Sequence, residues 1–303
     1  MSNTRISPKR KKQLLFIASV LFIPLLMFLI FYVYINLQNF GLAFQSIDYY
    51  GNKTWVGLEN FKDFFDGLKN DSQVGLSVKN SLKIWALSFG ISMPLYLIFS
   101  YYIFRKYIGA GPFSIIVMLP EVISGFVFAL IYSKFVETAL PSLMKSWYSV
   151  EKFPQLIFDE RYAFGNNIFY SIWLSFGTST LIYSNAMRAI DDEIFESARL
   201  DGASDSQEFF HIVLPLIWPT LSTFIVTGVG GMFTASGSLM AFYMMDAPPS
   251  IWGFGYYISR MVKTDTSMGS YSLIAASGLA VSLMTIPITF TVKWLTEKLD
   301  KTE

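Results

Sequence analysis

Six long apolar stretches constrain the fold of this chain more strongly than any other feature of its sequence. Each approaches or exceeds the ~20 residues that an α-helix needs to cross the hydrocarbon core of a bilayer. They cover residues 14–35, 82–104, 113–133, 167–186, 217–243 and 270–292. Only Lys83 and Glu121 carry a charge within them. The chain is therefore expected to be an all-α membrane protein with six transmembrane helices, surrounded by lipid.

The composition agrees with this fold class and argues against several others. Of the 303 residues, 53% are hydrophobic and only 15% are charged, which is too apolar for an ordinary soluble domain of this length. The absence of cysteine excludes disulfides and thiolate metal sites. A net charge of +1, with no basic stripe beyond the N-terminus, argues against binding to nucleic acid.

The charges before the first stretch predict the orientation. Five cations and no acid precede it, which by the positive-inside rule places the N-terminus in the cytoplasm. Six spans then put the C-terminus on the same side. The cytoplasmic segments would be residues 1–13, 105–112, 187–216 and 293–303, and the extracytoplasmic loops residues 36–81, 134–166 and 244–269. The first stretch exceeds the about 7 to 15 apolar residues of a signal peptide core, so it is expected to be a retained helix.

A polar segment between the fourth and fifth stretches has the features of two short helices. Asp191 and Asp192 are candidate N-caps of the first helix, and Gly202 suits the positive φ that ends one. Ser204 and Gln207 have the spacing of a capping box for the second helix, which would continue through His211 and Ile212. Pro215 and Pro219 are expected to end that helix and bend the chain into the fifth span. Ile190, Ile194 and Ala198 lie four residues apart and should share one face, with the small Ala198 allowing a partner to approach closely.

This segment resembles the conserved cytoplasmic loop of binding-protein-dependent ABC importer permeases. Residues 196–203 read E-S-A-R-L-D-G-A and residues 212–215 read I-V-L-P, which matches the E-A-A, G and I-x-L-P elements of the family at the family's spacing, with Ser197 in place of an alanine. The resemblance implies the type I ABC importer permease fold, with a coupling-helix loop between helices 4 and 5 that docks onto an ATPase subunit. The residues implied in docking are Glu196, Ser197, Ala198, Asp201, Gly202, Ala203, Ile212, Leu214 and Pro215.

Other motifs resemble the carbohydrate branch of this family, which includes the larger membrane subunit of the maltose transporter. Residues 55–61 read W-V-G-L-E-N-F, and residues 80–82 read N-S-L where the branch has N-T-L. Residues 246–249, D-A-P-P, depart from the branch's G-G-P turn. The resemblance implies import of a sugar or oligosaccharide across the bacterial cytoplasmic membrane. It also implies a second homologous permease, an ATPase dimer that uses ATP and Mg, and an extracytoplasmic solute-binding protein.

The resemblance further implies substrate contacts on the helices that flank the cytoplasmic loop. These positions fall near Ser175, Thr178, Met232, Phe233 and Ser236. Glu121 is the one acid deep in an apolar stretch and is a functional hypothesis for that reason, although its place after Pro120 equally suits a structural role near the interface. In the fifth span, two rows of small residues at i, i+4 spacing favour close helix packing.

No catalytic site is recognisable in the sequence. A phosphate-binding loop is missing, so another chain would have to hydrolyse ATP, and no cofactor or metal is expected in this one. His211 has no metal-ligating neighbours. An ion-gradient-driven secondary transporter is the alternative, but it would need acids or histidines within the spans, where only Glu121 qualifies. A membrane-embedded enzyme would need a catalytic constellation that the sequence does not contain.

Overall fold

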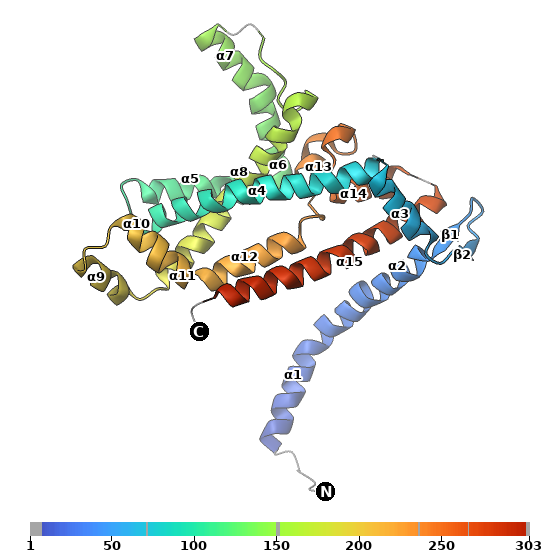
Figure 1. Cartoon of the computed structure of the whole chain (residues 1–303), viewed down its shortest axis with the longest axis horizontal. Helices are drawn as coiled ribbons and strands as arrows, with labels where there is room; N and C mark the ends of the chain where they lie inside the picture. The colour runs from blue at the N-terminus through green and yellow to red at the C-terminus, as the bar shows by residue number, and fades with distance from the viewer. Residues whose placement is uncertain (1–7, 71, 150–151, 236, 266, 301–303) are drawn as a thin grey trace. The chain divides into compact units, whose positions relative to one another are not determined.

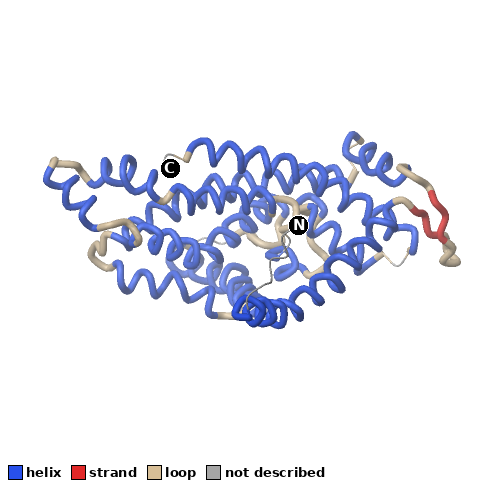
Figure 2. The backbone as a smooth tube through the Cα atoms, turned by 90° about the horizontal axis from the view of Figure 1, so that it is seen from below, coloured by secondary structure: helices blue, strands red, loops and turns tan. Residues whose placement is uncertain are grey.

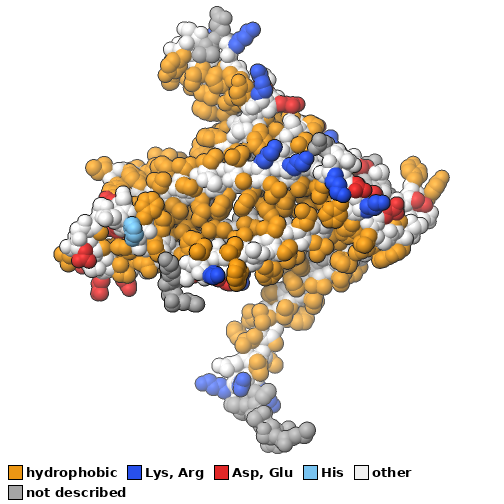
Figure 3. Space-filling model, viewed as in Figure 1, with side chains coloured by type: hydrophobic (Ala, Val, Ile, Leu, Met, Phe, Trp, Pro, Cys, Tyr) orange, Lys and Arg blue, Asp and Glu red, His pale blue; other side chains and the backbone are white. Residues whose placement is uncertain are grey.

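The computed structural model describes residues 8–70, 72–149, 152–235, 237–265 and 267–300, and helices dominate it (Figures 1 and 2). The chain divides into two compact units. The first contains the residues up to Phe64 together with Thr266–Ala280, and the second contains Phe65–Asp265 together with Val281–Glu303. Hydrophobic side chains cover much of the visible surface of the long helices (Figure 3), as expected of helices that face lipid.

The first unit begins with a helix of 35 apolar-rich residues, Lys9–Ala43. This stretch comprises α1 (Pro8–Met27) from its second residue onward, a π-helical segment η1 (Phe28–Tyr34) and α2 (Ile35–Ala43). Nearly all of its side chains are exposed in the isolated chain. The predicted first span, residues 14–35, lies inside this helix. A β-hairpin follows, in which β1 (Gln45–Ile47) pairs antiparallel with β2 (Lys53–Trp55).

The motif at residues 55–61 holds this hairpin against the end of α2. The Asn60 amide donates to the carbonyls of Ala43 and Gln45 at 2.9 Å, which fixes the junction between helix and strand. Gly57 has a φ of +62°, a conformation that glycine adopts without a Cβ penalty. The rings of Trp55 and Phe44 stack at 5.5 Å. The motif at residues 55–61 therefore has a structural explanation.

The second unit is built around two long helices, α4 (Gln73–Phe104) and α8 (Glu160–Arg188), which pack along each other. The Ser100 hydroxyl donates to the Thr180 carbonyl at 2.8 Å, and the Tyr96 hydroxyl donates to the Ile172 carbonyl at 3.1 Å. Helix α5 (Ala110–Val122) packs on α8 at Gly177, whose missing side chain admits the backbone of α5. The predicted second and fourth spans lie within α4 and α8.

Two of the predicted spans are not continuous helices. The third divides into α5 and α6 (Gly125–Lys134), because Ile123 takes an extended backbone conformation and Ser124, with a ψ of 129°, is not helical either. Pro120 supplies no N–H to the last turn of α5, and Gly125 is a weak helix former, so the break falls between them. Helix α6 continues through η2 (Phe135–Ala139) into α7 (Leu140–Tyr148).

The fifth predicted span breaks in the same way. It divides into α12 (Trp218–Gly230) and α13 (Gly237–Tyr243), with turns after the adjacent glycines 230 and 231. Two neighbouring glycines carry the largest conformational entropy loss in a helix, which explains where α12 ends. The sixth predicted span lies within α15 (Met268–Leu299).

Among the described residues, four helices are long and apolar enough to cross a membrane: Lys9–Ala43, Gln73–Phe104, Gly125–Tyr148 and Gly269–Leu299. A fifth span results if Asp205–Leu216 and Trp218–Gly230, which meet at 67°, are counted together. Helix α8 is 29 residues long, about 43 Å, but it carries more polar side chains than these helices.

The loop after α13 is fastened to the start of α4. It contains η4 (Pro249–Ile251), followed by α14 (Phe254–Thr264). The Asn80 amide donates to the carbonyls of Ser250 at 2.8 Å and Trp252 at 3.1 Å, and the Ser81 hydroxyl accepts the N–H of Phe254 at 2.8 Å. The polar pair of the N-S-L motif thus satisfies backbone groups of this loop. The D-A-P-P residues lie in the same fastened loop.

Candidate functional site

The segment between α8 and α12 folds as a helix, a sharp turn and a second helix. The first helix is α9 (Asp192–Leu200), and the second runs through α10 (Asp205–Glu208), η3 (Phe209–Val213) and α11 (Leu214–Leu216). Gly202 has a φ of +79°. Ser204 and Gln207 form the capping box that their spacing predicts, with Ser204 N–H donating to Gln207 Oε1 at 2.9 Å. We call residues 191–217 the cytoplasmic segment, after the side of the membrane on which the sequence predicts it to lie.

The exit from the second helix agrees with the sequence prediction: the helix ends at Leu216, one residue after Pro215, and the chain bends by 67° at Ile217, between Pro215 and Pro219. Two details differ. Asp191 stands at the N-cap with extended backbone, but its side chain makes no capping hydrogen bond. Ile194 is 38% exposed, so the buried face of α9 is formed by Phe195 and Ala198 rather than by Ile190, Ile194 and Ala198.

The inner face of the cytoplasmic segment belongs to the core of the second unit. Phe195, Val213 and Ile217 are at most 3% exposed and pack in one apolar cluster with α4 and α8 residues such as Tyr101 and Met187. Ala198 is 9% exposed and also faces inward. Ala198 therefore lies on the inner side of α9 in this chain, and its contact with a partner stays a prediction.

The outer face carries most of the residues implied in docking. Glu196, Ser197, Asp201, Gly202 and Pro215 are exposed, while Ala203, Ile212 and Leu214 are half-buried. A groove of 320 Å³ is lined by Asp201, Gly202, Ala203, Gln207, His211 and Ile212. Two large apolar side chains of the segment also face outward, Leu200 at 89% and Phe210 at 61% exposed. Such an exposed apolar and acidic surface is typical of a contact with another protein.

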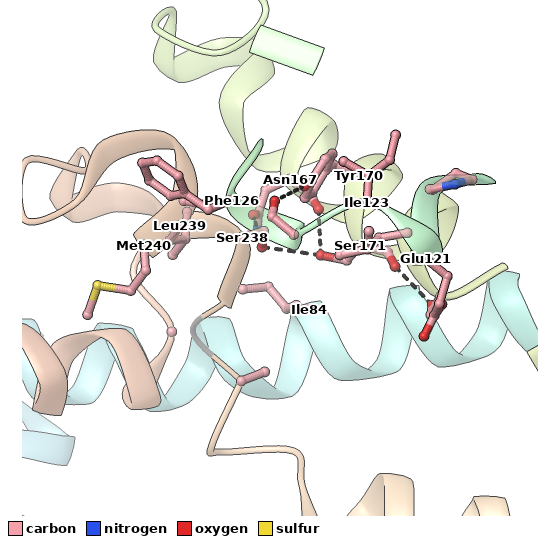
Figure 4. A pocket seen from close by; sticks show the side chains of 17 residues that line it. Ile84, Glu121, Ile123, Phe126, Asn167, Tyr170, Ser171, Ser238, Leu239 and Met240 are labelled. Atoms are coloured by element: carbon pink, nitrogen blue, oxygen red, sulfur yellow. Dashed lines mark hydrogen bonds between the residues drawn. The ribbon is translucent and has the colours of Figure 1, made fainter. Parts of the chain in front are cut away.

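A second candidate site is a cavity of 740 Å³ between α4, α5, α6, α8 and α13. Its polar lining consists of Glu121, Asn167, Tyr170, Ser171, Ser175 and Ser238. Asn167, Ser171 and Ser175 lie four residues apart on one face of α8. Ser238 donates to Asn167 Oδ1 at 2.6 Å, and its hydroxyl lies 3.3 Å from that of Ser171 (Figure 4). The hydroxyl and amide groups form a row that leads towards Glu121.

A smaller cavity of 250 Å³ shares Ile84, Ser171 and Ala235 with the large one. Trp85 and Ser88 of α4 line it. Trp85 Nε1 and Ser88 Oγ are buried without a hydrogen-bond partner in the described part of the chain. Because buried polar atoms are almost always hydrogen-bonded in native proteins, these two atoms are available to water or to a ligand in the cavity.

The residues implied in substrate contact fall at different places. Ser175 and Glu121 line the large cavity, and Met232 lines the smaller one. Phe233 is buried and packs edge to face against Phe254. Thr178 lines neither of these two cavities. Ser236 lies outside the described residues.

Sequence reasoning missed Asn167 and Ser171, and it placed Ser238 in one of the two rows of small residues of the fifth span, Gly230, Thr234 and Ser238, that favour helix packing. The signal that could have identified the first two was present, since Asn167 and Ser171 continue the i, i+4 row that contains Ser175. The contact of Ser238 with Asn167 joins positions 71 residues apart, so a local sequence pattern cannot predict it. No three His, Asp or Glu side chains gather to hold a metal ion in the part of the chain that the structure describes.

Comparisons with known proteins identify the family. Residues 4–302 match the model of the "Binding-protein-dependent transport system inner membrane component", so the chain belongs to this family and is a membrane component of an ABC transport system. This confirms the resemblance inferred from the cytoplasmic segment.

The relatives agree with this membership. The chain is 29% identical over 281 residues to the "Probable ABC transporter permease protein YurN" of Bacillus subtilis, covering 86% of this chain and 90% of that protein. It is 23% identical to the "Galactooligosaccharides transport system permease protein GanP" of the same organism, covering 88% and 66% of the two chains. A chain of the bacterial alginate ABC transporter in complex with alginate pentasaccharide-bound periplasmic protein has the same fold, with a TM-score of 0.78 at 20% identity over 97% and 98% of the two chains.

Proposed function

We propose that this chain is one of two homologous permease subunits of an ABC importer that carries a sugar or oligosaccharide across the cytoplasmic membrane. The observation that carries the proposal is the arrangement on α8. Its N-terminal half lines the polar cavity, and its C-terminus leads directly into the cytoplasmic segment. From Ser171 to Arg188 the helix extends about 26 Å, so one element links a candidate ligand cavity to a candidate docking surface.

The chemistry of the cavity supports a carbohydrate. Hydroxyl and amide groups can donate to and accept from the hydroxyl groups of a sugar, and the apolar lining, including Phe126 and Tyr170, can cover the C–H faces of its ring. The relatives named above include a galacto-oligosaccharide permease and an alginate importer. Among the described residues that line the cavity, Glu121 alone is charged. Its negative charge would repel an anionic sugar, so this subunit favours neutral over anionic sugars.

The topology and partners follow the same proposal. Six spans with both termini in the cytoplasm would place the cytoplasmic segment on the ATP side of the membrane. Two copies of an ATPase subunit, which bind ATP and Mg, would dock on this segment and its counterpart in the second permease. A solute-binding protein outside the membrane would deliver the sugar. Closure of the ATPase dimer would push the segments and switch the permease pair from inward-open to outward-open, as rigid-body alternating access requires.

The test is substrate uptake by the reconstituted transporter. Glu196→Arg reverses an exposed charge on α9, and Gly202→Leu places a Cβ at a positive φ that disfavours it. Both variants are expected to reach the membrane and to lose ATP-dependent uptake. Normal uptake by both would refute the docking assignment. Uptake by the chain alone that an ionophore abolishes would instead establish the secondary-transporter alternative.

A further inference from the structure

A buried acid connects the cytoplasmic segment to the end of α4. Glu208, the last residue of α10, is 1% exposed. The guanidinium of Arg105, which immediately follows α4, lies 3.0 Å from Glu208 Oε1, and the Tyr101 hydroxyl donates to the same oxygen at 2.9 Å. The Arg105 side chain is itself only 15% exposed. Because this ion pair has little contact with water, removal of either partner would leave the other charge buried and unpaired, which strongly destabilises the folded state.

Arg105 also contacts a second acid on the same short helix. Its Nη2 donates to Asp205 Oδ1 at 2.8 Å, and the Tyr107 hydroxyl donates to Asp205 Oδ2. The hydrogen bond from Tyr107, together with the charge of Arg105, lowers the pKa of Asp205, so this carboxylate stays ionised near neutral pH. Arg199 of α9 adds a longer contact, 3.7 Å from Glu208 Oε2. Arg105 thus joins two acids one helical turn apart, and Glu208 in turn faces α9.

The position of this cluster gives it a mechanical consequence. The cytoplasmic segment is continuous in sequence with α8 and α12, so any displacement of the segment moves the ends of those two helices directly. Helix α4 has no such covalent link, because 86 residues lie between Arg105 and Asp192 in the chain. The hydrogen bonds from Ser100 and Tyr96 join α4 to α8, but they do not contact the segment itself. A two-point attachment of Arg105 to Asp205 and Glu208 fixes both distance and orientation.

We propose that Arg105 and Glu208 are positioning residues that attach the cytoplasmic segment to α4, so that its movement is passed to α4 as well as to α8 and α12. This inference rests on the proposed function, because it assumes that an ATPase displaces the segment. The energy input is then distributed over three helices. Ile84 of α4 lines both cavities. A displacement of the segment by the ATPase would therefore also move a wall of each cavity.

The direct test measures whether the two elements move together. The chain has no cysteine, so spin labels can be attached at Lys106→Cys, beside Arg105, and at Ser206→Cys on α10. In the assembled transporter the distance distribution between the labels is expected to stay the same with and without ATP. In the Glu208→Gln variant it is expected to broaden or shift when ATP binds. A shift of the native distribution on ATP binding would overturn the proposal.

The functional test separates coupling from folding. Glu208→Gln keeps the acceptor for Tyr101 and removes the charge, which leaves Arg105 without its buried partner. The double variant Arg105→Gln with Glu208→Gln removes both charges and is expected to recover the native Tm. If the pair positions α4, the double variant still loses the stimulation of ATP hydrolysis by the loaded binding protein, by about tenfold, while basal hydrolysis persists. If the pair only stabilises the fold, recovery of Tm restores stimulation, and the proposal is wrong.

Two exposed positions provide controls, Lys106→Gln beside Arg105 and Glu297→Gln, which breaks the exposed Lys293–Glu297 pair of α15. Both are expected to leave stimulation unchanged. The failure of this inference is distinguishable from the failure of the proposed function. In the first case Glu196→Arg abolishes uptake while the Glu208 variants transport normally, and in the second case Glu196→Arg and Gly202→Leu both transport normally.

Discussion

The contact between α5 and α8 at Gly177 offers a prediction whose size follows from the structure. A Cβ added at Gly177 would lie 2.2 Å from the carbonyl oxygen of Val117, 2.9 Å from its carbonyl carbon and 3.1 Å from Met118 Cα. All three are backbone atoms, so no side-chain rotation can relieve the overlap. For Gly177→Ala to be accommodated, α5 must move away from α8 by about 1 Å.

Overpacking of this kind costs about 1 to 3 kcal/mol, and a clash with backbone atoms belongs to the upper part of that range, about 2 to 3 kcal/mol. The better helix propensity of alanine returns about 0.5 to 1 kcal/mol, so the net loss is about 1 to 2.5 kcal/mol. For a unit of this size, that corresponds to a fall in Tm of about 2 to 10 °C. The same displacement would move Glu121 relative to Ser175 across the large cavity, so sugar-stimulated ATP hydrolysis should weaken as well.

Gly165 is the matched control, because it lies on the same helix and an added Cβ there meets nothing within 4 Å. Gly165→Ala is expected to leave Tm unchanged or to raise it slightly. The measurement is the thermal stability of the detergent-solubilised transporter, followed by size-exclusion chromatography after heating. Equal Tm values for the two variants would show that α5 and α8 do not approach each other at Gly177, and would refute the helix arrangement on which the cavity depends.

Three further predictions concern single side chains. Asn80→Ala removes the donor to two loop carbonyls, so it should lower Tm by an amount equivalent to about 1 to 3 kcal/mol and increase proteolysis of residues 246–252, whereas exposed Asn70→Ala should not. Ser204→Ala removes the capping box and should destabilise the complex by about 1 kcal/mol, detected as weaker retention of the ATPase on purification. Glu121→Gln should preserve uptake of a neutral sugar and raise that of a uronate at low salt, and an unchanged preference would contradict the proposed charge selection.

The sequence predicts local structure best where one short pattern determines it. Gly202 and the Ser204–Gln207 capping box act within a few residues, and the structure confirms both. The apolar stretches likewise predict where long helices lie, but not that two of them break. The breaks lie near Pro120 and the glycine pair at 230 and 231, which weaken a helix. Whether the helix continues past such residues depends on its surroundings, and the apolarity of a stretch does not reveal this.

The candidate sites were predictable to different degrees for the same reason. Ser175 and Glu121 were identified from the sequence, and both line the large cavity. Ser238 could not be placed there, because its partner Asn167 is remote in the chain. The Arg105–Glu208 pair joins positions 103 residues apart, and in the sequence Glu208 is one of several acids in a polar loop. Glu208 is buried because α4 packs against the segment, and this packing cannot be inferred from the sequence.

The contacts between α4 and α8 determine where the second unit can change shape. Two hydrogen bonds join the C-terminal half of α4 to α8, Tyr96 to Ser175 at 2.7 Å and Ser100 to Thr180 at 2.8 Å, and the pair of Arg105 and Glu208 at 3.0 Å joins the end of α4 to α10. These contacts keep α4, α8 and the segment together when the segment moves, so a change in the shape of the cavity requires other lining elements to move relative to them. Residues 123–124 and 231–235 interrupt α5–α6 and α12–α13, and Ile123 and Ala235 line the cavity.

Backbone hinges absorb large φ/ψ changes at a few residues, and a break in a helix supplies such residues without the loss of further hydrogen bonds. Amide hydrogens at residues 123–125 and 231–235 are therefore expected to exchange with solvent faster than those at residues 96–100 in the resting transporter, and to change most when ATP binds. Hydrogen exchange followed by mass spectrometry measures both. Equal protection of all three regions would mean that the broken helices are as rigid as the α4–α8 body, and the movement that opens the cavity would then have to arise between the two permease subunits.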